Sequence, residues 1–193
     1  MEQLEGQVAI ITGAGTGIGR GIALALAGEG ARPVVCGRRK DRLQETLAAI
    51  RKAGGEGLAV RADVSKQADV ERVVAKALEG YGTVDILVNN AGIGGEDSIH
   101  EHELADWEEV MAVNLRGPFL MARAVLPSMR RQRRGHIINI SSESGLEYYE
   151  GSGAYGVSKH ALNALGEYIQ RENQELGIRV NTICPGMVVT EMT

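Results

Sequence analysis

The sequence predicts an α/β protein in which a parallel, doubly wound sheet is flanked by helices on both faces. The observation that supports this fold class is an alternation from end to end of short β-branched runs with segments of helical apolar spacing. Such an alternation implies βαβ units, in which helices connect the strands of a parallel sheet. At 193 residues, 44% of them hydrophobic, the chain is expected to form a single domain over residues 1–193.

The expected strands set the order of the remaining elements. They are VAIIT (8–12), PVVCG (33–37), LAVRAD (58–63), DILVNN (85–90), HIINIS (136–141) and IRVNTIC (178–184). Segments between them repeat apolar residues at intervals of three and four, the spacing of one helix face. The clearest cases are Val70, Val73, Val74, Ala77 and Leu78, and then Leu120, Val125 and Met129.

A long helix is expected before the last strand, from about Ser152 to Leu176, with Gly177 as its end. Its apolar stripe is assigned to Val157, Ala161, Leu165 and Ile169. This assignment places Tyr155 and Lys159 together on a different face of the helix.

Charge and composition argue against several classes of function. A net charge of −4 and the lack of basic stretches interleaved with aromatics predict no binding of nucleic acid. The basic run MRRQRRG (129–135) is interpreted as a helix end, because its arginines complement the negative helix pole and Gly135 would stop the helix. The N-terminal MEQLEGQVAIIT is neither a signal peptide nor a membrane span, which predicts a cytoplasmic protein without membrane association.

The placement of cysteine and histidine predicts neither a disulfide nor a metal site. Cys36 and Cys184 each lie in an apolar strand of a chain without signs of secretion, so both are expected to be reduced core residues. The HEHE cluster (100–103) has a spacing that does not place ligands on one helix face, and no Cys or His group completes a ligand set.

A glycine-rich turn, TGAGTGIG (12–19), follows the first strand and opens a helical segment. This context predicts a dinucleotide-binding loop, with the spacing T-G-x-x-x-G-x-G in place of G-x-G-x-x-G. Gly13 is expected to permit the tight turn, Gly17 to admit backbone N–H groups to a pyrophosphate, and Gly19 to let the helix pack closely. The competing interpretation is a loop that needs positive φ without binding phosphate. The predicted cofactor contacts of this loop are Thr12, Gly13, Gly15, Thr16, Gly17, Ile18 and Gly19.

The end of the second expected strand favours NADP over NAD as the cofactor. A dinucleotide fold places an acid on the adenosine ribose about twenty residues beyond the glycines. This chain has Gly37 there, followed by Arg38, Arg39 and Lys40. A guanidinium can bind a 2′-phosphate by charge-assisted hydrogen bonds, whereas a carboxylate would repel it. The alternative is a set of exposed charges at a helix start, where cations oppose the helix dipole.

Five further motifs follow TGAGTGIG in order: DV (63–64), NNAG (89–92), INISS (138–142), YGVSK (155–159) and PGMVVT (185–190). On these motifs the whole chain resembles the short-chain dehydrogenase/reductase family. The resemblance implies a Rossmann domain that binds NAD(P) and transfers hydride between nicotinamide and a carbonyl or secondary alcohol. It assigns the catalytic tetrad to Asn114, Ser142, Tyr155 and Lys159. Ser142 is chosen over its neighbour because its distance before the tyrosine is usual in the family.

The resemblance also implies further cofactor contacts, in addition to Arg38 and Arg39. These are Asp63 and Val64 at the adenine, Asn89, Ala91 and Gly92 beside the cofactor, Tyr155 and Lys159 at the nicotinamide ribose, Pro185, Gly186 and Val188 after the last strand, and Thr190 at the carboxamide. Asn114 would hold a water on the proton path. Members of the family usually continue past this point, so a C-terminal part is expected beyond Thr193. A homodimer or homotetramer is implied, built on helices around 118–131 and 152–176.

The spacing of Tyr155 and Lys159 suits proton transfer. Carbonyl reduction places negative charge on oxygen, which needs a proton donor and hydrogen-bond support. Tyr155 can donate the proton and Ser142 can support the oxygen. In the reverse direction, forming a phenolate at pH 7 costs about 4 kcal/mol for an ordinary tyrosine. An ammonium one helical turn away offsets roughly 3 kcal/mol of this cost.

Two functions are compatible with the sequence. The first is an NADPH-dependent carbonyl reductase acting on a small molecule, with Tyr148 and Tyr149 lining a pocket for a fairly apolar carbonyl compound. The second is a noncatalytic NADP-binding sensor or scaffold on the same fold. Turnover of a carbonyl substrate distinguishes them.

Overall fold

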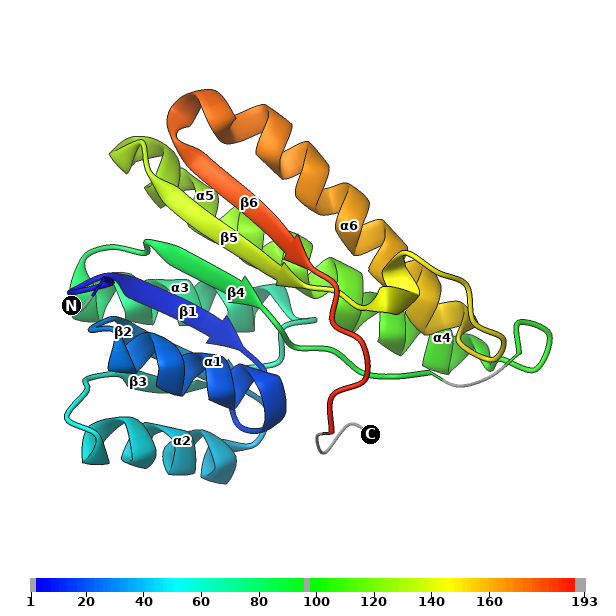
Figure 1. The fold of residues 1–193 in the computed structure, drawn as a ribbon, viewed down its shortest axis with the longest axis horizontal. Coiled ribbons are helices and arrows are strands. Elements are labelled where there is room, and N and C mark those ends of the chain that lie inside the picture. Colours follow the sequence, from blue (N-terminus) through cyan, green and yellow to red (C-terminus); the bar gives the residue numbers. More distant parts are fainter. Residues whose placement is uncertain (1–2, 96–97, 190–193) are drawn as a thin grey trace.

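A computed structural model describes residues 3–95 and 98–189 and confirms the predicted fold class. The strands form one parallel sheet of six in the order β3-β2-β1-β4-β5-β6 (Figure 1). Their bounds are β1 Val8–Thr12, β2 Arg32–Gly37, β3 Leu58–Arg61, β4 Ile86–Asn89, β5 Gly135–Ile140 and β6 Ile178–Ile183. Every expected strand is therefore present, in the predicted parallel arrangement.

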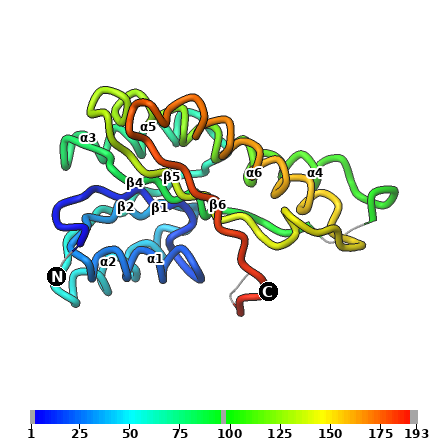
Figure 2. Tube along the Cα trace, turned by 45° about the horizontal axis from the view of Figure 1, so that its top comes forward, coloured from blue at the N-terminus to red at the C-terminus, as the bar shows by residue number. Residues whose placement is uncertain are grey.

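Helices connect the strands and cover both faces of the sheet. Their bounds are α1 Gly17–Gly28, α2 Lys40–Lys52, α3 Gln67–Tyr81, α4 Leu104–Met111, η1 Ala112–Arg116, α5 Gly117–Gln132, η2 Glu143–Gly145, α6 Gly153–Asn173 and η3 Gln174–Leu176. Figure 2 shows α3, α5 and α6 on one side of the sheet and α1 and α2 on the other. The helix layers agree with two buried clusters, one beneath each layer.

Alternation within β1 supplies both clusters, because successive side chains point to opposite faces of a strand. Val8 and Ile10 belong to the cluster under α3, α5 and α6, and Ala9 and Ile11 to the cluster under α1 and α2. The chain runs outward from β1 to β3 and then returns to place β4 on the other side of β1. In such sheets this switch point leaves a crevice at the carboxyl ends of the strands, where ligands bind.

The basic run 129–135 ends α5, as predicted, but Gly135 is not the residue that stops the helix. The helix ends at Gln132, and its cap is Arg133, which adopts left-handed backbone angles (φ 53°). Gly135 instead begins β5, where a methyl group in place of its hydrogen would lie 2.5 Å from Met129 Sδ. The glycine is therefore explained by close packing against the helix that it was expected to stop.

The predicted apolar stripe of α6 is wrong in its N-terminal half. Val157 is 44% exposed, whereas Ser158 and Lys159 are buried and Lys159 is 4% exposed. The buried face comprises Ala154, Ser158, Lys159, Leu162, Gly166, Ile169 and Asn173. Apolar spacing missed this face because the helix begins beside β5 and η2, where the buried partners are polar.

The cysteine prediction is confirmed for Cys36 and corrected for Cys184. Cys36 lies in β2 and is fully buried, and burial raises the pKa of its thiol to about 12. Cys184 is half-buried and lies just beyond β6, outside the core, and both thiols are free. None of the helices in the described ranges is long and apolar enough to cross a membrane.

Candidate active site

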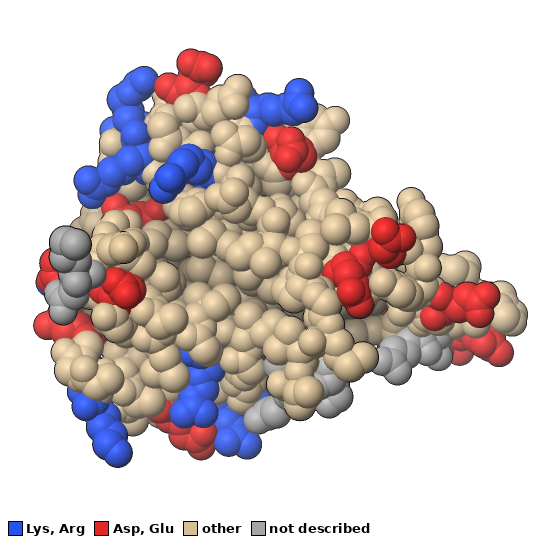
Figure 3. Space-filling model, viewed as in Figure 1, with Lys and Arg blue, Asp and Glu red and all other residues tan. Residues whose placement is uncertain are grey.

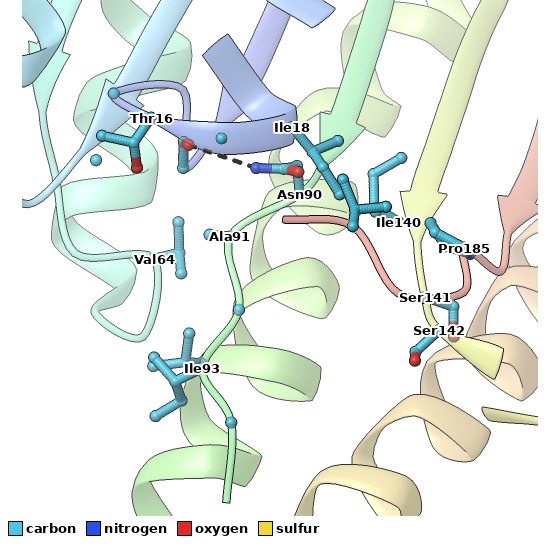
Figure 4. A pocket seen from close by; sticks show the side chains of 18 of the residues that line it. Thr16, Ile18, Val64, Asn90, Ala91, Ile93, Ile140, Ser141, Ser142 and Pro185 are labelled. Carbon is cyan, nitrogen blue, oxygen red and sulfur yellow. Dashed lines mark hydrogen bonds between the residues drawn. The ribbon is translucent and has the colours of Figure 1, made fainter. Parts of the chain in front are cut away.

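A cavity of about 640 Å³ opens along the carboxyl ends of the strands, at the switch point between β1 and β4. Its volume falls within the range of small-molecule and cofactor pockets. Figure 4 shows side chains from the glycine loop, from the segment after β4 and from the end of β5 on its wall. The lining residues are Gly13, 15–18, 37–39, Leu43, 62–64, 90–94, Val113, 140–143, Tyr155, Lys159 and 185–188.

The glycine loop has the conformation expected of a phosphate-binding turn. Gly13 and Gly17 have φ of 65° and 53°, which glycine adopts at no steric cost. Thr16 caps α1 without a side-chain hydrogen bond, and the first turn of α1 contains no acidic residue. Backbone N–H groups and the positive helix pole are therefore available to an anion, so the loop fits a pyrophosphate.

Gly19 allows α1 to approach the sheet closely, as predicted. A methyl group at this position would contact Asn90 Nδ2 and lie 2.6 Å from the carbonyl oxygen of Gly13. Backbone cannot move aside as a flexible side chain can, so Gly19→Ala must shift either α1 or the glycine loop.

We expect Gly19→Ala to lower the free energy of unfolding by about 2 kcal/mol, because the added methyl overpacks the junction. It should also weaken cofactor binding by displacing Gly13. The control is Gly21→Ala on the same helix, where a methyl group meets nothing within 4 Å. That variant should be stabilised by roughly 0.5 kcal/mol, since alanine is the better helix former. Urea denaturation and cofactor titration compare the two, and equal stabilities would contradict the close-packing explanation.

Hydrogen bonds between the end of β1 and the segment after β4 hold the turn in place, through the side chains of Thr12 and Asn90. The Thr12 hydroxyl accepts hydrogen bonds from the N–H groups of Asn90 and Ala91, both at 2.9 Å. Asn90 Nδ2 donates to the carbonyl oxygens of Thr12 at 2.9 Å and of Gly13 at 3.4 Å, the second drawn as a dashed line in Figure 4. Thr12 and Gly19 thus shape the loop from behind the cavity wall.

Asn89 does not have the position that was predicted for it. Its side chain is buried in β4 and donates to Asn139 Oδ1 at 2.9 Å in β5. Asn90 lines the cavity in its place, followed by Ala91 and Gly92. Alternation explains the difference, since adjacent side chains of a strand point to opposite sides.

Basic side chains lie at the end of the cavity beyond β2. Arg39 Nη2 donates to Thr16 Oγ1 at 3.1 Å, and Arg38 Nη1 lies 3.6 Å from Glu109 Oε1. The exposed side chain of Arg38 makes this ion pair weak. Gly37, the last residue of β2, has no side chain to enter the cavity, and a methyl group there would make ordinary van der Waals contacts with Leu43 Cδ2 at 3.7 Å and Gly13 Cα at 3.9 Å.

Asp63 and Val64 line the same end of the cavity after β3. Partial burial raises the pKa of the Asp63 carboxyl, but hydrogen bonds from the hydroxyl and N–H of Ser65 outweigh that effect and lower it overall. Lys66 and Arg38 lower this pKa further through their positive charges. Asp63 is therefore an anion at neutral pH that faces the basic residues of β2.

Ser142, Tyr155 and Lys159 line the part of the cavity near the end of β5 and the start of α6. Lys159 Nζ donates to the carbonyl oxygen of Ile140 at 2.9 Å and lies 5.4 Å from the centre of the Tyr155 ring. Burial lowers the pKa of Lys159 to about 8, so most of it is still protonated at pH 7. The hydroxyl of Ser141 donates to the carbonyl oxygen of Lys159 at 3.3 Å, which leaves Ser142 as the less buried of the two serines.

Asn114 lies behind this group in η1, a π-helical turn. Its Oδ1 accepts from the N–H of Ile93 at 2.9 Å, and its Nδ2 donates to the carbonyl oxygen of Ile93 at 2.9 Å and to Ser158 Oγ at 3.0 Å. The side chain is 1% exposed and is not part of the cavity wall. Asn114 therefore connects Ile93, in the segment after β4, to Ser158 in α6, the residue before Lys159. Single-turn π-helices are frequent at functional sites.

Several predicted site residues lie elsewhere, and several cavity residues were not predicted. Tyr148 is 89% exposed and stacks on His160, with ring centres 5.0 Å apart, and neither Tyr148 nor Tyr149 lines the cavity. Thr190 lies outside the described residues. The unpredicted lining residues include Asn90, Ile93, Glu143 and Met187. Each lies within three residues of a predicted one, so the motifs indicated the segments, and the backbone decides which side chains point inward.

Comparisons with known proteins agree with this architecture. Residues 7–193 match the family model for short chain dehydrogenases. An uncharacterized oxidoreductase of Thermotoga maritima is 40% identical over 187 residues, which cover 97% of this chain and 74% of the relative. The structure of levodione reductase is similar with a TM-score of 0.96 and 35% identity, covering 98% of this chain and 75% of that one.

A second solved structure holds a nucleotide. A short-chain dehydrogenase/reductase from Burkholderia phymatum, in complex with NAD, is similar with a TM-score of 0.95 and 36% identity, covering 100% of this chain and 69% of that one. The fold and cavity define a Rossmann-type oxidoreductase of the CH–OH/C=O class. The chain belongs to the short-chain dehydrogenase family.

Proposed function

We propose that the protein is an NADP(H)-dependent oxidoreductase that interconverts a carbonyl compound and a secondary alcohol, with Tyr155 as the acid and base. The observation that carries this proposal is the buried ammonium of Lys159, which lies 5.4 Å from the centre of the Tyr155 ring and donates to the carbonyl oxygen of Ile140, two residues before Ser142. The same cavity continues to the glycine loop, so one elongated ligand could reach both ends.

The residues divide the proton chemistry between them. When bound, the nicotinamide supplies a hydride to the carbonyl carbon or accepts one from the alcohol carbon. Tyr155 donates its hydroxyl proton to the carbonyl oxygen in reduction and takes it back in oxidation. Ser142 supports the same oxygen by a hydrogen bond. Lys159 Nζ lies 5.4 Å from the centre of the Tyr155 ring. With the phenolate charge taken as centred on the ring and an effective dielectric of about 20, the ammonium stabilises a Tyr155 phenolate by roughly 3 kcal/mol. Asn114 positions this group from behind.

NADP preference is the finer part of the proposal. Gly37, Arg38 and Arg39 support it, because they combine the absence of an acidic side chain with two guanidinium groups where a 2′-phosphate would lie. The relative from Burkholderia phymatum is in complex with NAD, so the NADP preference rests on the residues of this chain and not on that relative. Asp63 at the same end is an anion, but its charge is already offset by Lys66 and Arg38.

Arg38→Asp should shift the preference towards NAD. We expect the ratio of Kd for NAD to Kd for NADP to fall about tenfold or more, because a favourable charge contact becomes a repulsive one. The matched control is Arg51→Asp, the same charge change in the last turn of α2 and away from the cavity. Titration of both cofactors gives the ratio. If Arg38→Asp and Arg51→Asp give the same ratio of Kd for NAD to Kd for NADP, Arg38 does not bind the 2′-phosphate.

Turnover decides between catalysis and the alternative of a noncatalytic NADP-binding sensor or scaffold. A panel of aldehydes, ketones and secondary alcohols is followed by the absorbance of the reduced cofactor. Turnover of any member supports the oxidoreductase, whereas tight cofactor binding without turnover supports the sensor.

A homodimer or homotetramer through α5 and α6 is also proposed, supported by the exposed Phe119 and Tyr168 on these helices.

A further inference from the structure

Glu143 is a charged residue of the cavity wall to which the proposed chemistry assigns no role. It follows Ser142 directly and lines the same cavity. Its N–H donates to the carbonyl oxygen of Pro185 at 2.9 Å, which fixes the backbone beside the segment after β6. A methyl group on Gly186 would lie 3.2 Å from Glu143 Oε2, so the carboxylate lies against Gly186 on the cavity wall.

The carboxylate of Glu143 has no protein partner within the described residues. The other charged residues of the cavity wall each make a hydrogen bond or an ion pair to protein atoms. These residues are Arg38, Arg39, Asp63 and Lys159. Glu143 begins η2, but a helix of three residues has too small a dipole to explain an acid there. Glu143 is exposed, so its carboxylate is solvated and accessible to a ligand in the cavity.

Apart from the buried ammonium of Lys159, the segments around this end of the cavity contain few basic residues. The sequence contains no lysine or arginine from position 77 to 115 or from 135 to 158, the two segments that flank Ser142 and Tyr155. On the face drawn in Figure 3, the right-hand end of the molecule, where α4, η2 and the start of α6 lie in Figure 1, shows acidic but no basic side chains. Such a charge distribution raises the local concentration of cations and repels anions.

Resting on the proposed oxidoreductase function, we infer that Glu143 is a specificity-determining residue that selects substrates with a protonated amine next to the reacting carbon. The ammonium group of an amino alcohol or amino ketone would pair with the carboxylate while the oxygen contacts Ser142 and Tyr155. Substrates with a carboxylate at that position, such as hydroxy acids, would be disfavoured by repulsion. The reaction itself is unchanged.

Three alcohols that share one carbinol test the inference. Phenylethanolamine, styrene glycol and mandelate differ in bearing an ammonium, a hydroxyl or a carboxylate beside the same secondary alcohol. We expect the full chain, with NADP or NAD, to oxidise phenylethanolamine with a kcat/KM about tenfold or more above that for mandelate. Glu143→Gln should lower this ratio about tenfold, and Glu143→Lys should invert it. Ratios within one variant cancel any general loss of activity.

Two controls separate charge recognition from a structural effect. Glu147→Gln changes an exposed acid in the same loop that does not line the cavity, and its ratio should stay close to that of the unmodified protein. High salt should reduce the ratio in the unmodified protein, since screening weakens a charge contact but not a shape contact. A ratio that neither Glu143→Gln nor salt changes would overturn the inference.

Binding measurements decide the question independently of turnover. Calorimetry with oxidised cofactor and Tyr155→Phe compares the Kd of phenylethanolamine with that of mandelate, with and without Glu143→Gln. A preference for the amine that is lost in Glu143→Gln supports the inference, whether or not any alcohol is oxidised. If no alcohol is oxidised, that result refutes the proposed function and leaves the inference about Glu143 in place. Equal Kd values for amine and acid would refute the inference alone, provided that turnover is observed.

Discussion

Tyr155→Phe is expected to lower kcat/KM for any carbonyl or alcohol substrate by about 10³-fold, because the phenyl ring retains the shape of the side chain but has no proton to transfer. The tyrosine is half-buried at the start of α6, where its backbone carbonyl oxygen accepts a hydrogen bond from Ser158 Oγ at 2.6 Å. This bond does not involve the phenol, so the variant should fold normally and bind cofactor with a Kd within roughly threefold.

The control for this prediction is Tyr148→Phe, which removes a phenol of the neighbouring loop that is 89% exposed and outside the cavity wall. Its turnover should stay close to that of the unmodified protein. Initial rates from the absorbance of the reduced cofactor, with circular dichroism as the check on folding, compare the variants. A Tyr155→Phe protein that keeps its rate would exclude Tyr155 as the acid and base.

The fold could be predicted from particular stretches of the chain because strands that are buried on both faces need apolar residues. VAIIT is nearly all apolar and DILVNN has the apolar core Ile86–Val88, and the structure makes them β1 and β4 in the middle of the sheet, with burial on both faces. Strand order did not follow from the alternation alone, because it depends on which side of β1 the chain returns to after β3.

The helix end and the buried lysine that could not be predicted from the sequence depend on contacts between distant segments. Arg133 adopts left-handed backbone angles while a glycine is two positions away, because Gly135 is required by its contact with Met129. Lys159 is buried in a position that apolar spacing excluded, because the carbonyl oxygen of Ile140 satisfies its ammonium. No local pattern indicates a partner nineteen residues away in the chain.

Lys159→Met should impair catalysis and stabilise the cofactor-free protein at the same time. Burial lowers the pKa of Lys159 from 10.5 to about 8, so the folded state binds the lysine proton less tightly than the unfolded chain does. At about 1.4 kcal/mol for each pH unit, holding the charge inside costs roughly 3 kcal/mol at pH 7. Losing the hydrogen bond to Ile140 offsets about 1 kcal/mol of the gain. The free energy of unfolding should therefore rise by about 2 kcal/mol.

The pH dependence of stability gives an independent test, because its direction follows from the lowered pKa. Between about pH 8 and pH 10.5 the unfolded chain holds a proton at Lys159 that the folded protein has lost. The contribution of Lys159 to stability therefore rises with pH across this window and is constant below it. Urea denaturation from pH 7 to pH 10 should show the unmodified protein gaining stability relative to Lys159→Met. Parallel curves would mean that Lys159 has an ordinary pKa.

The kinetic effect of Lys159→Met should be at least about 100-fold on kcat/KM, since roughly 3 kcal/mol of stabilisation of the Tyr155 phenolate is lost. Lys159→Arg is the informative companion, because it keeps a positive charge but cannot place it at the same atom. If charge alone matters, arginine should restore much of the rate. If the contact with the Ile140 carbonyl oxygen positions the charge, arginine should restore little, because its larger, planar head group does not fit a buried site shaped for an ammonium. A gain in stability combined with a loss in rate would show that a residue unfavourable to folding is retained for its chemistry.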